Sequence, residues 1–213
     1  MANDLTLWGA GTSRTMRAHW MLLELGLDYQ FHPIGSRTGE TQSGEFVRLN
    51  PRHKIPVLQH GSFVLTESAA IIHYLSRTFP SAQIHVAEDH QSRAAIDEWC
   101  YFIISELDAG SLYVVRRHDG LKHLYGEAPT AVESAKSYFL HNLEAMAPSL
   151  GRQHPYLFGE RLSVADILLT TCLDWAAAER IALPGPAQRY RARVAVRPAY
   201  RAALARNFAA HKV

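Results

Sequence analysis

The sequence lacks most features that mark membrane or secreted proteins. It contains no run of about 18 apolar residues, which excludes an ordinary transmembrane helix. Its first residues lack a basic segment and a long apolar run, so we expect no secretory signal. Only two residues are cysteine, Cys100 and Cys172, in apolar surroundings and at no metal-ligand spacing. We interpret both as buried thiols of a cytoplasmic protein.

Charge of one sign is also scarce. The 22 Lys and Arg residues nearly balance the 20 Asp and Glu residues, for a formal net charge of +2. Residues 176–213 are the exception, with eight basic residues and one acid. Since no aromatic interleaving or recognition motif accompanies them, we predict a solvated arginine-rich face there, not a nucleic-acid or membrane site. The 12 histidines form no HExxH motif, so no metal site is expected.

The apolar periodicity changes character near residue 80. The first part alternates between strand-like and helix-like patterns. Its expected elements are a strand at Leu5–Trp8, a helix from Ser13, a strand at 29–34, a hairpin of 56–60 with 62–66, and a helix at 68–79. Residues 35–47 are polar and hold three glycines, so they are expected to be a loop or a short irregular helix.

Only helix patterns follow the linker-like residues 83–90. They are expected from about 91 to 118, from 129 to about 150, from Ser163 onward, and as shorter helices over 187–210. The order predicts a small α/β domain followed by an all-α domain.

One candidate site lies where the first strand meets the first helix. The run Gly11-Thr12-Ser13 places hydroxyls at the helix start, and Ser13 is predicted to be the N-cap. Free N–H groups at a helix N-terminus stabilise an anion, and a hydroxyl there can donate a hydrogen bond to a thiolate. Plain capping and anion binding are both compatible with this segment.

Two further segments could bind a ligand. Residues 50–58 (Asn-Pro-Arg-His-Lys-Ile-Pro-Val-Leu) open a strand at Pro56. If the Ile55-Pro56 bond is cis, Ile55 would turn its main-chain groups outward, where a peptide-like ligand could pair with them. Glu67-Ser68 begins a helix, which is either a second anion site or a plain helix start capped by Thr66.

A fourth segment carries a folding signal. Ser163 and Asp166 have the spacing of a capping box at the start of an apolar helix. We assign this pair no catalytic role.

In their order and spacing, the four segments resemble those of the cytosolic glutathione transferases, in particular bacterial-type members with an active-site serine. The Ser13 turn is similar to the family's catalytic loop, and residues 50–58 to its Asn-Pro…Lys-Val-Pro-x-Leu segment. Glu67-Ser68 resembles its Glu-Ser pair, and residues 159–166 its helix-capping motif. Arg197-Pro198 is similar to its C-terminal Arg-Pro, so the likeness runs nearly end to end.

The resemblance implies a thioredoxin-like α/β domain over residues 1–82, a linker over 83–90 and an all-helical domain over 91–213 with the electrophile site. It also implies a cis bond at Ile55-Pro56, a homodimer, and glutathione as cosubstrate with no metal. It implies the following roles: Ser13 stabilises the glutathione thiolate, Ile55 pairs with the cysteinyl main chain, Glu67 and Ser68 hold the γ-glutamyl end, and Lys54, helped by His53, meets the glycyl carboxylate.

The chain departs from part of that family. Many members use a tyrosine or a cysteine in the first loop, and neither stands here, which leaves serine-type chemistry. Thr12 adjoins Ser13, and we favour Ser13 because an N-cap side chain points at the first-turn N–H groups. By analogy with the family, Tyr113 and Arg116 could face the electrophile, although a charged exterior face with a core tyrosine explains them equally well.

The function implied is a detoxifying transferase that activates the glutathione thiol as a thiolate for attack on a small electrophile. A non-catalytic glutathione-binding or protein-interaction module on the same fold stays an alternative, as does a glutathione-dependent isomerase or peroxidase. A thiol–disulfide oxidoreductase is disfavoured because no cysteine lies near position 13.

Overall fold

The computed structural model describes residues 4–150 and 154–209. They form two compact units, one from the described residues of Met1–Val86 and Val196–Val213, the other from Ala87–Ala195. The α/β part followed by helices agrees with the predicted fold class. The expected boundary differs at the C-terminal end, because the last helix belongs to the first unit and not to the helical one.

The first unit is built on a small mixed sheet. Its four strands, β1 (Leu5–Trp8), β2 (Gln30–His32), β3 (Val57–His60) and β4 (Phe63–Thr66), lie in the order β2-β1-β3-β4. The first two are parallel and the other pairs are antiparallel. The strand–helix–strand order and the hairpin predicted from the sequence are therefore confirmed.

Helix α1 (Ser13–Glu24) follows β1, and its buried face includes Met16 and Trp20 at the predicted helical spacing. Gly26, with φ of +64°, lies just beyond its C-cap, where a left-handed conformation favours glycine. Helix α3 (Ser68–Thr78) packs against α1. The short helices η1 (Glu40–Gln42) and α2 (Gly44–Leu49) occupy and extend beyond the segment expected to be a loop or short helix.

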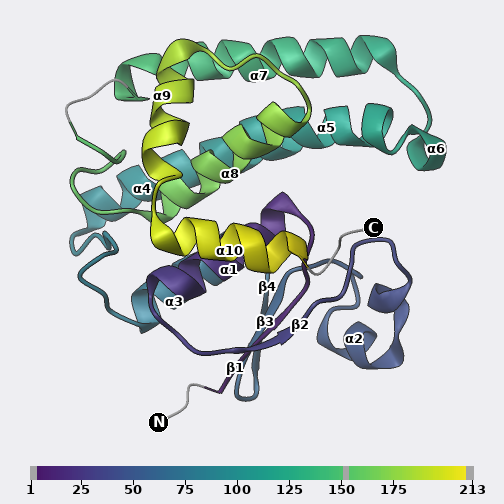
Figure 1. Cartoon of the computed structure of the whole chain (residues 1–213), viewed down its shortest axis with the longest axis vertical. Coiled ribbons are helices and arrows are strands. Elements are labelled where there is room, and N and C mark those ends of the chain that lie inside the picture. The colour runs from purple at the N-terminus through teal and green to yellow at the C-terminus, as the bar shows by residue number, and fades with distance from the viewer. Residues whose placement is uncertain (1–3, 151–153, 210–213) are drawn as a thin grey trace. The chain divides into compact units, whose positions relative to one another are not determined.

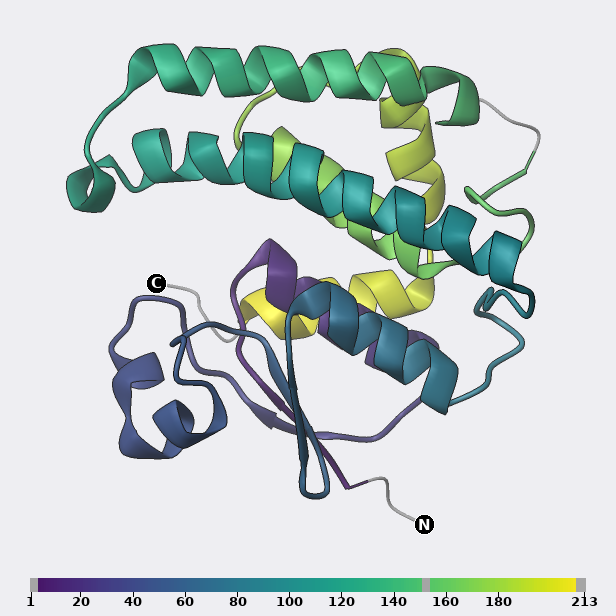
Figure 2. The same ribbon diagram turned by 180° about the vertical axis from the view of Figure 1, so that it is seen from behind.

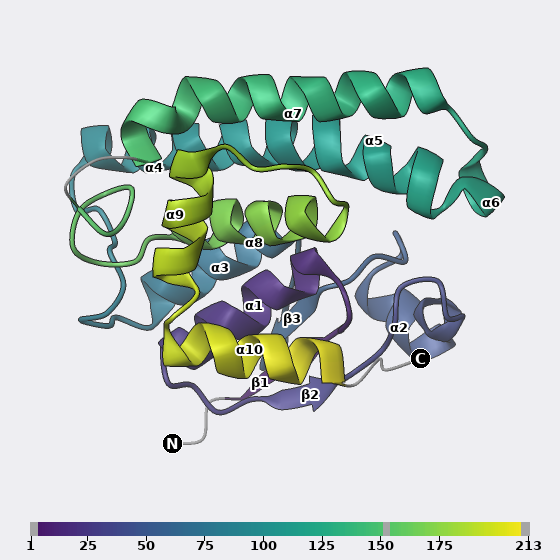
Figure 3. The same cartoon turned by 45° about the horizontal axis from the view of Figure 1, so that its top comes forward.

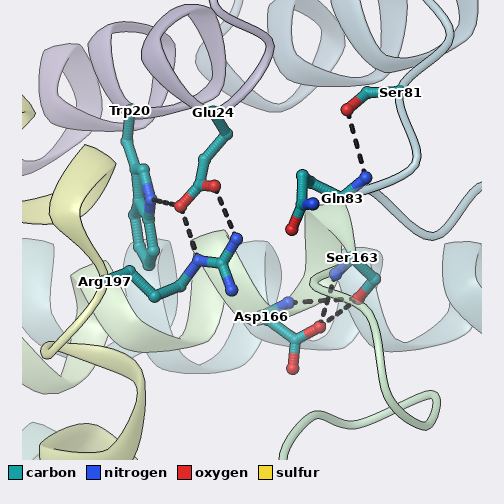
Figure 4. Close-up of polar contacts among 7 residues, drawn as sticks. All are labelled: Trp20, Glu24, Ser81, Gln83, Ser163, Asp166 and Arg197. Carbon is teal, nitrogen blue, oxygen red and sulfur yellow. Dashed lines mark hydrogen bonds and ion pairs between the residues drawn. The ribbon is translucent and has the colours of Figure 1, made fainter.

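The last helix, α10 (Pro198–Ala209), packs along α1 (Figures 1 and 3). Arg197 donates from Nε and Nη2 to the two carboxylate oxygens of Glu24, each at 2.6 Å. Trp20 Nε1 donates to the same carboxylate at 2.7 Å (Figure 4). The Trp20 ring packs edge-on against the ring of Tyr200. The prediction of a solvated arginine-rich face is therefore wrong at Arg197, whose buried partner Glu24 anchors the helix.

The second unit is helical. Its elements are α4 (His90–Phe102), η2 (Ile103–Leu112), α5 (Tyr113–Val115), η3 (Arg116–Gly120), α6 (Lys122–Tyr125), α7 (Pro129–Leu150), α8 (Val164–Ala178) and α9 (Gly185–Val194). The elements α4, η2, α5 and η3 follow one another as one continuous helical rod. Helix α7 runs alongside this rod (Figure 2). The long helix predicted over 91–118 is confirmed in extent, while α6 was not predicted.

Two stretches of that rod, η2 and η3, are π-helical. In η2 the Ser111 hydroxyl donates to the carbonyl of Glu106, five residues earlier, at 2.6 Å. A Cβ at Gly110 would lie only 2.9 Å from the Ser105 carbonyl oxygen, so the missing side chain permits the wide turn. Periodicity does not separate a π-turn from an α-turn over so few residues.

The predicted capping box at α8 is confirmed. Ser163 is the N-cap, and Asp166 accepts hydrogen bonds from its main-chain N–H at 2.7 Å and its hydroxyl at 2.6 Å (Figure 4). The same carboxylate also accepts from Leu157 N at 2.8 Å and from the Tyr190 hydroxyl. Burial raises the pKa of Asp166, and these hydrogen bonds oppose the rise.

Both cysteines are free and buried, as predicted. Within residues 4–150 and 154–209, every helix is too short or too polar to cross a lipid bilayer.

Candidate functional site

The turn between β1 and α1 is capped by Thr12, so the prediction that Ser13 is the N-cap is wrong. The Thr12 hydroxyl accepts a hydrogen bond from Thr15 N at 3.0 Å, and Thr12 N donates to the Thr15 hydroxyl at 3.0 Å. This reciprocal pair is a capping box made of two threonines. The physical reason is that Thr12, not Ser13, has the extended backbone that an N-cap needs, with φ of −129°.

Ser13 is instead the first residue of α1 and is half-buried. Within the part of the chain that the structure describes, its hydroxyl has no hydrogen-bond partner, whereas that of Thr12 is engaged by Thr15. The first turn of α1 carries no acidic side chain to offset the positive end of the helix dipole. This end of α1 therefore offers a hydroxyl beside an uncompensated positive potential.

The strand end before this turn lies against Ile55. A Cβ at Gly9, which has φ of +114°, would stand 2.6 Å from the Ile55 Cβ and 3.0 Å from Thr15 Cγ2. Only glycine allows this approach, which brings the segment before β3 to the start of α1. The Ile55-Pro56 peptide bond is cis, as the resemblance implied.

Asn50 shapes the loop that precedes Ile55. It is buried, its Nδ2 donates to the Lys54 carbonyl at 2.8 Å, and its Oδ1 accepts from Arg52 N at 3.1 Å. Lys54 is exposed. His53 Nδ1 lies 2.8 Å from the Thr41 carbonyl oxygen, which can only accept, so this nitrogen carries a proton. Nε2 of the neutral ring is then an acceptor, and only the protonated ring could donate to a carboxylate.

Glu67 and Ser68 stand at the start of α3. Glu67, and not Thr66, occupies the N-cap position, and its side chain caps no first-turn amide. Its φ of 68° is rare outside glycine and costs about 1–3 kcal/mol, a strain found often at ligand clamps. Its exposed carboxylate lies 3.4 Å from Arg52 Nη1, and Arg52 also donates to the Thr66 hydroxyl.

Arg17 connects the starts of the two helices. It lies one turn after Ser13 on α1, is fully buried, and donates from Nη1 to the Ser68 hydroxyl at 3.2 Å. Because the Ser68 oxygen accepts this bond, its own proton is available to an acceptor. A buried cation beside the first turn of α3 adds to the positive potential there.

These contacts bring the candidate residues of the first unit together. The Ser13 turn meets Ile55 through Gly9, and α1 meets Ser68 through Arg17. The arrangement presents two helix N-termini, two serine hydroxyls and an ammonium-bearing loop, which together suit a ligand with several anionic groups.

Comparison with known proteins identifies the family. The model of the Glutathione S-transferase N-terminal domain matches residues 3–77, and that of the Glutathione S-transferase C-terminal domain matches residues 102–198. Glutathione S-transferase D7 of Drosophila melanogaster is 31% identical over 179 residues, which are 81% of this chain and 76% of that protein. The chain belongs to the glutathione S-transferase family.

Two further relatives are described as theta-class members of that family. Glutathione S-transferase theta-3 of Mus musculus is 28% identical over 148 residues, 68% of this chain but only 61% of the mouse protein. The solved theta class glutathione S-transferase of Xanthomonas axonopodis pv. citri, with glutathione bound, is 27% identical. That structure superposes with a TM-score of 0.79 over 97% of each chain.

Tyr113 and Arg116, predicted to face the electrophile, lie in the second unit of this glutathione S-transferase family member. Tyr113 begins α5 and Arg116 begins η3, three positions along the same rod, and both are half-buried. Their separation places them on one side of the helix. Their part in substrate binding stays a prediction.

Four residues of the site were not predicted: Gly9, Arg17, Asn50 and Asn207. Arg17 carries a weak local signal, since it lies four positions after Ser13 and shares its helix face. Asn207, in α10, hydrogen-bonds to Thr12 and Thr15, which lie 195 and 192 positions earlier in the chain. No local sequence pattern predicts so distant a contact. Within the described residues, no group of three or more His, Cys, Asp or Glu side chains could hold a metal ion.

Proposed function

We propose that this protein is a glutathione transferase of the serine type, in which Ser13 stabilises the glutathione thiolate for attack on a small electrophile. The observation that carries this proposal is the half-buried Ser13 hydroxyl, which has no hydrogen-bond partner among the described residues and lies at an N-terminus of α1 whose first turn holds no acidic residue. A homologous solved structure, at 27% identity, has glutathione bound, which supports glutathione as the cosubstrate.

Glutathione would span the first unit. Its γ-glutamyl carboxylate would meet the N-terminus of α3, with the Ser68 hydroxyl donating and Glu67 pairing with the ammonium group. The main chain of Ile55 would pair with the cysteinyl part, as an added strand does. The exposed ammonium of Lys54 would meet the glycyl carboxylate, and His53 would add a hydrogen bond when its ring is protonated.

The energy required is modest. A free thiol with a pKa of about 8.5 is only about 3% thiolate at pH 7, and lowering that pKa by about 2 needs ~2.7 kcal/mol. One hydrogen bond to a charged group contributes about 1.5–3 kcal/mol. A helix dipole adds about 0.3–1 kcal/mol, or ~2 kcal/mol when partly buried. Ser13 and α1 together supply enough, so the proposal needs no metal and no general base.

The chemical step then has a simple balance. The thiol proton leaves to solvent, and the thiolate donates its electron pair to an electrophilic carbon. A carbon–sulfur bond forms, and the electrophile either releases a leaving group with its electron pair or takes up a proton after addition.

Replacing Ser13 by alanine tests this proposal. We expect the protein to retain its fold and its glutathione affinity within a few-fold, because the other contacts remain. The apparent pKa of the bound thiol should rise by about 1–2, with a corresponding loss in kcat at neutral pH. The measurement is thiolate absorbance of the glutathione complex across pH, followed by turnover of a general electrophile.

Thr12→Val is the matched control. It removes the other hydroxyl of the turn, so we expect a loss of about 1 kcal/mol in unfolding free energy from the lost cap and a smaller rise in the thiol pKa than in Ser13→Ala. A raised thiol pKa in Thr12→Val together with an unchanged one in Ser13→Ala would move the role to Thr12.

The same titration separates the alternatives. Glutathione binding without a lowered thiol pKa would favour a ligand carrier, and no binding would favour an interaction module of the same fold.

We further propose a cytoplasmic homodimer, which sedimentation analysis would test. We also propose that Tyr113 and Arg116 contribute to the electrophile site, and Arg116→Gln should change electrophile preference without changing glutathione affinity.

A further inference from the structure

Asn207, near the end of α10, is a fully buried polar residue that contacts the turn before Ser13. Its carboxamide oxygen accepts from the Thr15 hydroxyl at 2.7 Å, and its Nδ2 donates to the Thr12 carbonyl at 3.0 Å. Its main-chain carbonyl accepts from Gly11 N at 2.9 Å. Three hydrogen bonds therefore tie this residue to the main chain just before Ser13, at Gly11 and Thr12, and to the side chain of Thr15 just after it.

We infer that Asn207 is a positioning residue for thiolate activation, which holds the Thr12–Thr15 turn so that Ser13, and not Thr12, presents its hydroxyl to the sulfur. This inference rests on the proposed function, since it concerns the same thiol. Asn207 does not touch the ligand in this role and acts through the turn.

The orientation of the carboxamide is set by chemistry. The Thr12 carbonyl can only accept, so the NH2 group of Asn207 must face it, and the oxygen must face Thr15. That buried oxygen needs a donor, and within the described residues the Thr15 hydroxyl supplies it.

This orientation gives the hydrogen-bond chain one direction. With its single proton committed to Asn207, the Thr15 hydroxyl can only accept from the Thr12 hydroxyl, 3.0 Å away. The Thr12 proton is therefore used inside the turn, and the same oxygen already accepts from Thr15 N. Ser13 is left as the hydroxyl of this turn that can donate to a thiolate.

Without Asn207 the direction of the hydrogen bond between the Thr12 and Thr15 hydroxyls is no longer fixed. The Thr15 proton could then go to either oxygen of Thr12, since its hydroxyl lies 2.8 Å from the Thr12 carbonyl oxygen and 3.0 Å from the Thr12 hydroxyl oxygen. The turn would also lose the amide bond that holds the Thr12 carbonyl. We expect a less well placed Ser13 hydroxyl and first-turn N–H groups, and hence a weaker effect on the thiol.

Asn207→Ala tests the inference in the full-length protein, and Arg197→Gln is its control. Arg197 anchors the other end of α10 to Glu24, so its loss loosens the helix without touching the turn. For Asn207→Ala we expect the apparent pKa of the bound glutathione thiol to rise by about 1 and kcat at neutral pH to fall about threefold, as the thiolate fraction falls. The KM for glutathione should change less than about twofold. Arg197→Gln should leave the thiol pKa unchanged.

Thr15→Val removes the same hydrogen bond from the Thr15 side. It is the replacement variant if Asn207→Ala does not fold. It should raise the thiol pKa similarly, and the double variant should raise it by less than the sum of the two single effects. An unchanged thiol pKa in these variants, or an equal rise in Arg197→Gln, would overturn the inference.

Ser13→Ala, measured alongside, separates this inference from the proposed function. If Ser13→Ala raises the thiol pKa and Asn207→Ala and Thr15→Val do not, only the role of Asn207 fails. If the wild-type protein does not lower the thiol pKa of bound glutathione, the proposed function fails.

Discussion

At the scale of single residues, the start of α1 shows how one bonded neighbour changes a chemical assignment. Thr12 and Ser13 carry the same group, and adjacent positions in the sequence do not distinguish them. The Thr12 hydroxyl is hydrogen-bonded to Thr15. Ser13 is therefore favoured because its hydroxyl can donate to a thiolate, and not because it caps the helix. The prediction that Ser13 caps α1 is wrong, but Ser13 remains the residue that we propose to stabilise the thiolate.

His19 is a second residue whose chemistry depends on its partners. Its Nδ1 lies 2.8 Å from the Tyr29 hydroxyl and its Nε2 3.3 Å from the Gly9 carbonyl oxygen. The carbonyl can only accept, so Nε2 carries the proton and Nδ1 accepts from Tyr29. Burial, with a smaller contribution from the nearby Arg206, lowers the pKa of His19 to about 4, although the hydrogen bond to the Gly9 carbonyl acts to raise it.

We therefore predict that His19 makes stability depend on pH between 6.5 and about 4. In this window the unfolded chain binds a proton that the folded chain does not, so stability falls as pH falls and the loss is complete below about pH 4. The loss is on the order of 3 kcal/mol. Urea unfolding of wild type and His19→Gln across this range checks it, because the variant should lack this part of the dependence. Parallel curves for the two proteins would contradict the prediction.

At the scale of elements, the buried carboxylate of Asp166 at the start of α8 accepts four hydrogen bonds. Asp166→Ala removes the capping box and leaves the Tyr190 hydroxyl and Leu157 N without their acceptor. We expect a loss of about 3 kcal/mol or more in unfolding free energy. Chemical denaturation measures it directly.

Asp174→Asn is the control on the same helix. Asp174 pairs with Arg191 at 2.6 Å, but this ion pair is partly exposed, so its loss should cost no more than about 1 kcal/mol. Equal losses in the two variants would show that the four hydrogen bonds of Asp166 add nothing to the helix start.

At the scale of the whole molecule, α10 completes the first unit although it is last in the chain. It runs antiparallel to α1, with Arg197 on Glu24 at one end and Asn207 on Thr15 at the other. The side chain of Glu24 is only 4% exposed, so without Arg197 it would be a buried charge without its cation.

A chain that ends at Ala195 should therefore lose glutathione binding and the cooperative unfolding of residues 4–86. Limited proteolysis and calorimetric glutathione titration measure the two effects. A peptide of residues 196–209 added in trans should restore part of the protection, because it returns the missing face of α1. Wild-type glutathione affinity in the shortened chain would contradict this prediction.

The sequence by itself determined the elements whose causes are local. The Ser163–Asp166 spacing, the apolar period of α7 and the short hairpin of β3 and β4 each act within a few residues, and each was predicted. The resemblance that collected the candidate residues also rests on short segments in a fixed order. Tertiary structure alone decided that α10 joins the first unit, that Arg197 is buried on Glu24, and that Asn207 orders the Thr12–Thr15 turn. These contacts join positions separated by up to 195 residues, and the free energy that selects them comes from burial and hydrogen bonding that no local pattern encodes.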